Sequence, residues 1–140
     1  MTIDRFDGTK YRFLSNFWPA IVQFEGAWYP TVEHAYQAAK TTEKELRRAI
    51  CLAKTPYIAK RLGNAVVVRD NWENLKYSVM EDLVRQKFAI PDLQKLLLET
   101  GDEELIEGNT WGDVYWGVCD GKGQNNLGRI LMFVRNYYKR

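Results

Sequence analysis

The sequence predicts an α+β fold that is compact and mostly helical, forms a single domain over residues 1–140 and contains a few short strands. Three observations lead to this fold class. Helix-start signals recur along the chain, no βαβ alternation is visible, and the composition of 46% hydrophobic and 27% charged residues is that of an ordinary globular protein. A chain of 140 residues is also long enough to bury a core of its own.

The first 30 residues predict a β-hairpin. Ile21–Phe24 and Ala27–Tyr29 are the expected strands, because this region is rich in aromatic and β-branched residues. Glu25-Gly26 between them suits a tight two-residue turn, since glycine readily adopts a positive φ.

Three helices are expected next, each opened by a threonine whose side-chain oxygen can cap free backbone N–H groups. A glutamate three residues after the second threonine makes a capping box, a proline follows the third, and a glycine is expected to stop the third helix. The segments are Val32 to about Lys40 after Thr31, Thr42 with Glu45 to about Lys54, and Thr55-Pro56 to Gly63.

The rest of the chain predicts three further helices and two short strands. The strands are expected on either side of a stretch rich in Gly, Asn and Asp, and the last helix has an apolar stripe at helical spacing. The expected helices are about Asn71–Phe88, Pro91–Glu99 and about Leu127–Tyr138, and the expected strands are Leu105–Glu107 and Val114–Val118.

Charge and cysteine content exclude several classes of protein. The 20 basic and 18 acidic residues give a formal charge of +2, which does not support a strongly basic nucleic-acid arm. One histidine with Cys51 and Cys119 makes a poor zinc site and no disulfide framework, so no metal or other cofactor is expected. We expect a cytoplasmic protein with no membrane partner, because neither a span of roughly 20 apolar residues nor a signal peptide is visible. The oligomeric state stays open.

The first candidate site lies on the helix after the hairpin. Glu33, Gln37 and Lys40 share one face by their spacing, and two interpretations fit them. They form either a solvated ladder of surface side chains or the polar wall of a cleft, in which the positive helix N-terminus keeps Glu33 ionised. His34, the only histidine, suits a surface or capping role better than that of a general base.

Aromatic residues mark a second candidate region. Trp111 and Trp116 surround Asp113 in a Gly- and Asn-rich segment, which indicates a lining for a flat ligand. Trp72, at the start of a long helix, is either a core residue or a platform on which a base stacks.

A glycine-rich loop runs into the last helix. Over residues 121–129, free backbone N–H groups and the helix dipole could hold a phosphate, with Lys122 or Arg129 adding charge. A plain helix-entry loop is the alternative.

Sequence blocks across nearly the whole chain carry a family resemblance. They are Phe13–Phe17, Tyr29–Lys40, Arg69–Glu73, Lys87-Phe88, Asp113–Gly117 and Gly123–Arg135. Together, and in this order, they resemble the NADAR family of YbiA-like N-glycosidases. One departure is that Val118-Cys119 follows Trp116-Gly117, where many members have Asp-Gly or Gly-Gly.

The resemblance implies an enzyme that cleaves N-glycosidic bonds of ribose phosphates and nucleotides. The partner would be a nucleotide-like small molecule, such as an early riboflavin-pathway ribosylaminouracil intermediate, or a guanine base carrying ADP-ribose. Glu33 and Asp113 are then the catalytic carboxylates, and Lys40 joins them in some family proposals. The implied substrate-binding residues are Asn16, Phe17, His34, Gln37, Arg69, Trp72, Trp116, Gly117, Asn126 and Arg129.

The chemistry of this bond suggests roles for these groups. Glu33 would stabilise positive charge at C1′ or activate water, and Asp113 would contact ribose hydroxyls or the leaving group. Lys40 would bind phosphate or attack an opened sugar as an amine. A non-catalytic ADP-ribose or NAD sensor and a nucleic-acid-binding module are the alternatives, but a pure binder has no need of two carboxylates beside anionic phosphates.

Overall fold

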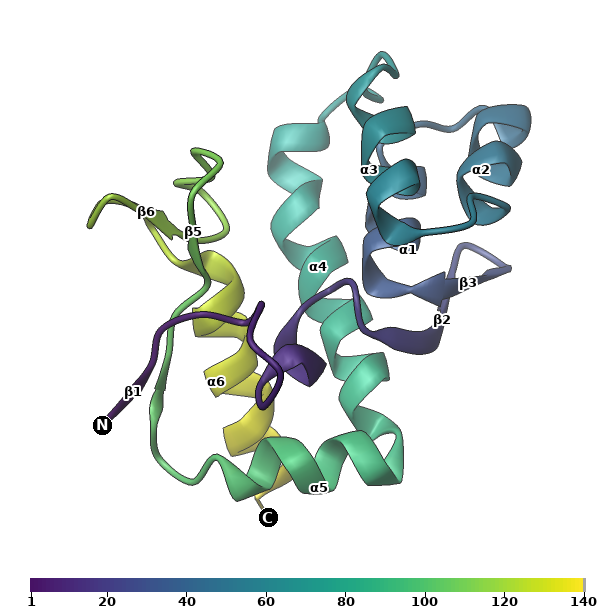
Figure 1. Ribbon diagram of the computed structural model, residues 1–140. Coiled ribbons are helices and arrows are strands. Elements are labelled where there is room, and N and C mark those ends of the chain that lie inside the picture. Colours follow the sequence, from purple (N-terminus) through teal and green to yellow (C-terminus); the bar gives the residue numbers. More distant parts are fainter. Residues whose placement is uncertain (140) are drawn as a thin grey trace. The chain divides into compact units, whose positions relative to one another are not determined.

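The computed structural model describes residues 1–139 and divides into two units. The central unit is Asn16–Lys87, and the terminal unit combines Met1–Ser15 with the chain from Phe88 onward. Helix α4 (Trp72–Ala89) carries the chain from the first unit into the second. Helices with a few short strand pairs confirm the α+β class (Figure 1). That the chain acts as a single domain stays a prediction.

The predicted hairpin is confirmed in the central unit. Strands β2 (Pro19–Phe24) and β3 (Ala27–Thr31) are antiparallel, and each is longer than the sequence indicated. Glu25 and Gly26 form the turn with φ values of 45° and 87°. Positive φ at both positions is the requirement of a type I′ turn, whose twist matches the strands.

Three helices follow the hairpin: α1 (Val32–Ala39), α2 (Lys44–Cys51) and α3 (Pro56–Asn64). Helix α1 packs against α2, α3 and both strands, so all of its residues are buried. Two of the predicted caps are confirmed, because Thr31 Oγ1 accepts from the N–H of His34 at 3.0 Å and Thr55 Oγ1 from that of Ile58 at 3.1 Å.

Two predictions about these helices are wrong. The capping box is absent, because Glu43 is the N-cap residue of α2 and its N–H donates to Thr41 Oγ1 at 3.1 Å. Gly63 does not end α3, which continues to Asn64. A Cβ added at Gly63 would lie 2.0 Å from Gln37 Oε1, so this glycine allows a close approach between two helices.

The terminal unit is built around α6 (Asn126–Tyr138), which packs against α5 (Pro91–Glu99) and β4 (Glu104–Leu105). Strand β1 (Thr2–Ile3) pairs in parallel with β4, and the one-turn 3₁₀ helix η1 (Arg12–Leu14) packs against α5. Phe13 and Phe88 make an edge-on ring contact with centroids 6.5 Å apart. Other buried apolar residues of this unit are Leu14, Leu93, Leu97, Leu105, Leu127, Ile130, Leu131 and Val134.

The two predicted strands of this unit are displaced. Strand β4 ends at Leu105, and the second pair joins β5 (Gly108–Asn109) to β6 (Val118–Cys119) in parallel. Residues 114–117 form no strand, because their carbonyls receive the N–H groups of residues 124–127 instead. None of the helices within residues 1–139 has the length and apolar character that crossing a bilayer requires.

Candidate functional site

Glu33 is a buried carboxylate with a defined partner. Its side chain is 7% exposed, that of Gln37 is 3% exposed, and Gln37 Nε2 donates to Glu33 Oε2 at 2.6 Å. The interpretation as a solvated ladder is therefore wrong for these two residues, because neighbouring elements enclose α1. At the start of the helix, the N–H of Glu33 donates to the carbonyl of Asn16 at 3.1 Å.

The other amide atom of Gln37 is a buried acceptor. Gln37 Oε1 accepts no hydrogen bond from the described residues, although it is shielded from solvent. Leaving such an atom unsatisfied costs free energy, so a ligand hydroxyl or an ordered water is the expected donor. Gly63 fixes the place of this acceptor, because the amide group lies directly against the glycine.

Lys40 ends the same helix as its C-cap residue. Burial lowers the pKa of Lys40 from its ordinary value; the charge of Glu33 opposes that shift, and the like charges of Lys60 and Lys76 add to it. Its Nζ lies 5.7 Å from the centroid of the Tyr36 ring. A lowered pKa increases the share of free amine, which is the nucleophilic form of lysine.

Trp72 packs onto this helix. It is 5% exposed, and its ring centroid lies 5.4 Å from that of Tyr36. Stacking of a substrate base on Trp72 stays a prediction. Of the two candidates that precede the hairpin, Asn16 donates its side-chain amide to Met80 Sδ at 3.5 Å, and Phe17 is half-buried.

His34 uses both ring nitrogens within the central unit. Nε2 donates to the carbonyl of Ala53 at 3.0 Å, and Nδ1 lies 2.7 Å from Thr31 Oγ1. Since a carbonyl only accepts, the proton sits on Nε2 and the threonine hydroxyl donates to Nδ1. Burial lowers the pKa of His34, and the bond to Ala53 opposes the shift. We therefore correct His34 from a substrate ligand to a structural residue that ties α1 to the loop before α3.

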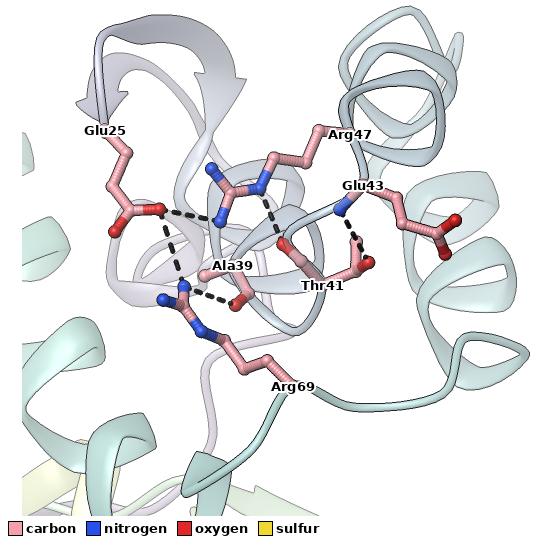
Figure 2. A network of polar contacts seen from close by, with 6 residues as sticks. All are labelled: Glu25, Ala39, Thr41, Glu43, Arg47 and Arg69. Atoms are coloured by element: carbon pink, nitrogen blue, oxygen red, sulfur yellow. Dashed lines mark hydrogen bonds and ion pairs between the residues drawn. The ribbon is translucent and has the colours of Figure 1, made fainter.

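Arg69 belongs to an ion network at the C-terminal end of α1, which Figure 2 shows. Its Nη1 lies 3.4 Å from Glu25 Oε1, and Arg47 Nη2 lies 2.7 Å from the same oxygen. Sequence reasoning selected Arg69 but missed Glu25 and Arg47. The available signal was an acidic residue at the first position of a turn that favours Asn, Asp or Gly.

Asp113 lies in the terminal unit, where hydrogen bonds hold it in its loop. Its Oδ1 accepts from the N–H groups of Tyr115 at 3.1 Å and Trp116 at 2.9 Å. The side chain of Asn109 holds the backbone of Asp113, because it accepts from the N–H of Asp113 at 3.0 Å and donates to its carbonyl at 2.9 Å. The ring of Trp116 meets that of Tyr115 edge-on with centroids 4.7 Å apart.

The phosphate cradle expected over residues 121–129 is not formed as predicted. The backbone N–H groups of residues 124–127 all donate to carbonyls of residues 114–117, at 2.8–3.2 Å, so they are not available to an anion. The loop therefore packs on residues 114–117. Gly117 in turn lies close to Glu107, because a Cβ added at Gly117 would be 2.1 Å from the carbonyl oxygen of Glu107. Asn126 is buried and Arg129 is exposed, and their substrate contacts stay predictions.

Helix α1 of this α+β fold thus carries a buried carboxylate and a buried amide, Glu33 and Gln37, and is followed by the half-buried Lys40. The chain belongs to the NADAR family, because the model of the NADAR domain matches residues 5–138. The resemblance inferred from the sequence blocks is thereby confirmed.

Named relatives cover most of the chain. It is 39% identical over 142 residues to N-glycosidase YbiA of Escherichia coli K12, covering 96% of this chain and 87% of that protein. It is 39% identical over 130 residues to the riboflavin biosynthesis protein VVA0006 of Vibrio vulnificus YJ016, covering 90% of this chain and 35% of that protein. The NMR structure of E. coli YbiA matches with a TM-score of 0.82 at 35% identity, covering 99% of this chain and 84% of that chain.

Proposed function

We propose that this N-glycosidase hydrolyses the C1′–N bond of a ribose-phosphate or nucleotide-type substrate. The observation that carries the proposal is the buried Glu33, which is paired with Gln37 on a helix that is followed by the half-buried Lys40. Relatives named N-glycosidases and riboflavin biosynthesis proteins support the bond type and one class of substrate. A guanine base carrying ADP-ribose is the other candidate substrate.

Breaking this bond places positive charge on C1′ and leaves an electron pair on the base nitrogen. We assign Glu33 to that positive charge, since a carboxylate in a buried site acts more strongly than one in water. It also takes a proton from the water that attacks C1′ after the base has left, and the oxygen of this water forms the new bond to C1′. Gln37 orients Glu33 and offers its buried Oε1 to a ribose hydroxyl or to the water.

We assign Lys40 to the reaction of an opened sugar. A lysine binds phosphate best as a cation, whereas burial lowers the pKa of Lys40 and so increases the share of its free amine. In an opened sugar, C1′ is doubly bonded to the base nitrogen. Lys40 Nζ would add to C1′ and pass its two N–H protons to the base nitrogen, so the base would leave as a free amine while Nζ forms an imine with C1′. Water would then hydrolyse this imine and return the free lysine.

We keep Asp113 as a catalytic carboxylate because it lies in a motif of the family. With Oδ1 accepting two backbone N–H groups, Oδ2 is the atom we assign to ligand contact.

The test is release of the base from two substrates. The protein is incubated with DNA carrying ADP-ribosylated guanine and with a ribosylaminouracil phosphate, and products are followed by mass spectrometry. We expect base release from one of them, and borohydride should trap a covalent adduct in wild type and in Lys44→Met but not in Lys40→Met. Lys44 is a matched control because it is an exposed lysine near α1. Binding of ADP-ribose with no release from either substrate would indicate a sensor and contradict the proposal.

A further inference from the structure

The C-terminal end of α1 is held by two arginines from outside the helix. The backbone N–H of Arg69 donates to the carbonyl of Lys40 at 2.6 Å, and its Nη1 reaches the carbonyl of Ala39 at 3.5 Å. Arg47 Nε donates to the carbonyl of Thr41 at 2.6 Å. The carbonyls of Ala39 and Lys40 lie at the partially negative end of the helix, where cationic donors are most effective, and that of Thr41 follows directly after it.

One carboxylate oxygen holds both guanidinium groups in place. Glu25 Oε1 contacts Arg47 at 2.7 Å and Arg69 at 3.4 Å (Figure 2). Although partial burial raises the pKa of Glu25, the hydrogen bond and charge of Arg47, followed by the charge of Arg69, lower it overall. Arg47 is further fixed by the ring of Phe24, whose centroid lies 5.2 Å away. Glu25 is therefore ionised and central to the network.

The backbone conformation of Glu25 is one that does not favour glutamate, so the contacts of its side chain are the reason to find a glutamate at this position. Its φ of 45° lies in the left-handed region, which a residue with a Cβ adopts at a cost. Asn, Asp and Gly are the favoured residues at this position of a type I′ turn. A glutamate here forgoes that preference, and in return its longer side chain reaches two arginines.

We propose that Glu25 is a positioning residue for Lys40: through Arg69 and Arg47 it fixes the carbonyls of Ala39 and Thr41, and so the backbone on both sides of Lys40. The inference rests on the proposed function of Lys40. Glu25 touches no reacting atom, and it acts by restricting the positions that the Lys40 amine can take. A displacement of about 1 Å at a reacting group can cost on the order of 100-fold in rate.

The test is the pair of variants Glu25→Asn and Glu43→Asn. Asparagine suits the left-handed turn position better than glutamate but is too short to hold both arginines, so Glu25→Asn should fold with unchanged or raised stability. Glu43 is the matched control, because it is exposed and its carboxylate points away from both guanidinium groups in Figure 2.

For Glu25→Asn we expect kcat to fall about tenfold with KM within twofold, since the chemical step rather than binding needs the positioned amine. Amide hydrogen exchange at Lys40, Thr41 and Arg69 should accelerate about tenfold, because their hydrogen bonds close this end of α1. Glu43→Asn should match wild type in all three measurements.

Three results would overturn the proposal: wild-type kcat in Glu25→Asn, wild-type exchange at the three amides, or a loss of kcat that follows an equal loss of thermal stability. The last result would mean that Glu25 serves folding alone. If the wild-type protein releases no base from either substrate, the proposed function fails, and the exchange measurement alone then decides whether Glu25 fixes the end of α1.

Discussion

Glu33 owes its buried, hydrogen-bonded environment to the elements packed around α1. A glutamate near the start of a helix is ordinarily solvated, yet here it is buried and receives a 2.6 Å hydrogen bond from Gln37. Burying a charge is costly unless it is paired and hydrogen-bonded. The free-energy cost of burying the Glu33 carboxylate would be reduced by a positive charge that develops on a bound substrate.

The charge of Lys60 gives a test of the role proposed for the Lys40 amine. Lys60 lowers the pKa of Lys40 by its like charge, so Lys60→Met should raise that pKa and move the rising limb of the kcat–pH profile to higher pH. Activity at pH 7 should fall severalfold because less free amine is present. The profile is measured by base release between pH 6 and about 10.

The control for this measurement is Lys44→Met, which should leave the profile in place. A rising limb at the same pH in Lys60→Met and wild type would contradict a role for the free amine of Lys40.

At the scale of elements, helix α1 is short but enclosed and capped at both ends. The Thr31 hydroxyl caps its start, and Arg69 binds the carbonyls of Ala39 and Lys40 at its end. A short helix is marginal alone, so its stability comes from packing against α2, α3 and the hairpin. The place of the Gln37 side chain therefore depends on the close approach of α3.

Gly63→Ala tests that dependence. The added Cβ would lie 2.0 Å from Gln37 Oε1 and 2.8 Å from Gln37 Cβ, so the helices themselves must move apart. We expect a loss of about 1–3 kcal/mol in the free energy of unfolding and a loss of activity, because the Gln37–Glu33 hydrogen bond is displaced. Urea denaturation and base release measure the two effects.

Gly8→Ala is the control, because a Cβ at Gly8 meets nothing within 4 Å. Full stability and full activity in Gly63→Ala would show that α3 does not hold Gln37 in place.

Local signals predicted the elements well, and tertiary contacts account for what was missed. Thr31 and Thr55 act within one helical turn, so the sequence predicted their caps. The prediction for Gly63 was wrong because this glycine allows a close contact with Gln37 of another helix. The residues next to Gly63 in the sequence give no sign of that contact. The limits of α5 (Pro91–Glu99) were predicted because proline opens the helix and Gly101 follows its end.

Local signals likewise predicted only part of the candidate site. Spacing placed Glu33, Gln37 and Lys40 on one face but could not decide between a buried and a solvated face. The network of Glu25 joins residues 44 positions apart in the sequence, so it could not be predicted from any single segment. The prediction of a phosphate site in the glycine-rich loop was not met. The N–H groups of residues 124–127 donate to the carbonyls of residues 114–117, which lie in another segment of the chain.

At the scale of the whole molecule, a buried lysine couples folding to pH. Lys87 is 1% exposed, and burial lowers its pKa from 10.5 to about 7. Between these two values the unfolded chain binds more protons than the folded chain at this site, so stability should rise with pH across this range. The contribution amounts to at most about 1.4 kcal/mol per pH unit.

Lys87→Met should remove this part of the pH dependence and increase stability at pH 7, because no ammonium group then has to be buried or neutralised. Urea denaturation at pH 7 and pH 9 measures both effects. Lys95→Met, at an exposed position of α5, should keep the wild-type dependence. An unchanged slope in Lys87→Met would contradict the assignment of this pKa to Lys87.

The central claim is that Glu33 provides charge to the transition state, and Glu33→Gln tests it most directly. Glutamine keeps the shape and an acceptor oxygen but removes the negative charge, and only interactions that strengthen in the transition state alter the chemical rate. Base release and ADP-ribose affinity are measured in parallel for wild type and variant. We predict a loss of on the order of 10²–10³ in turnover with the affinity within severalfold of wild type. Turnover near the wild-type rate, or loss of binding together with turnover, would contradict the account.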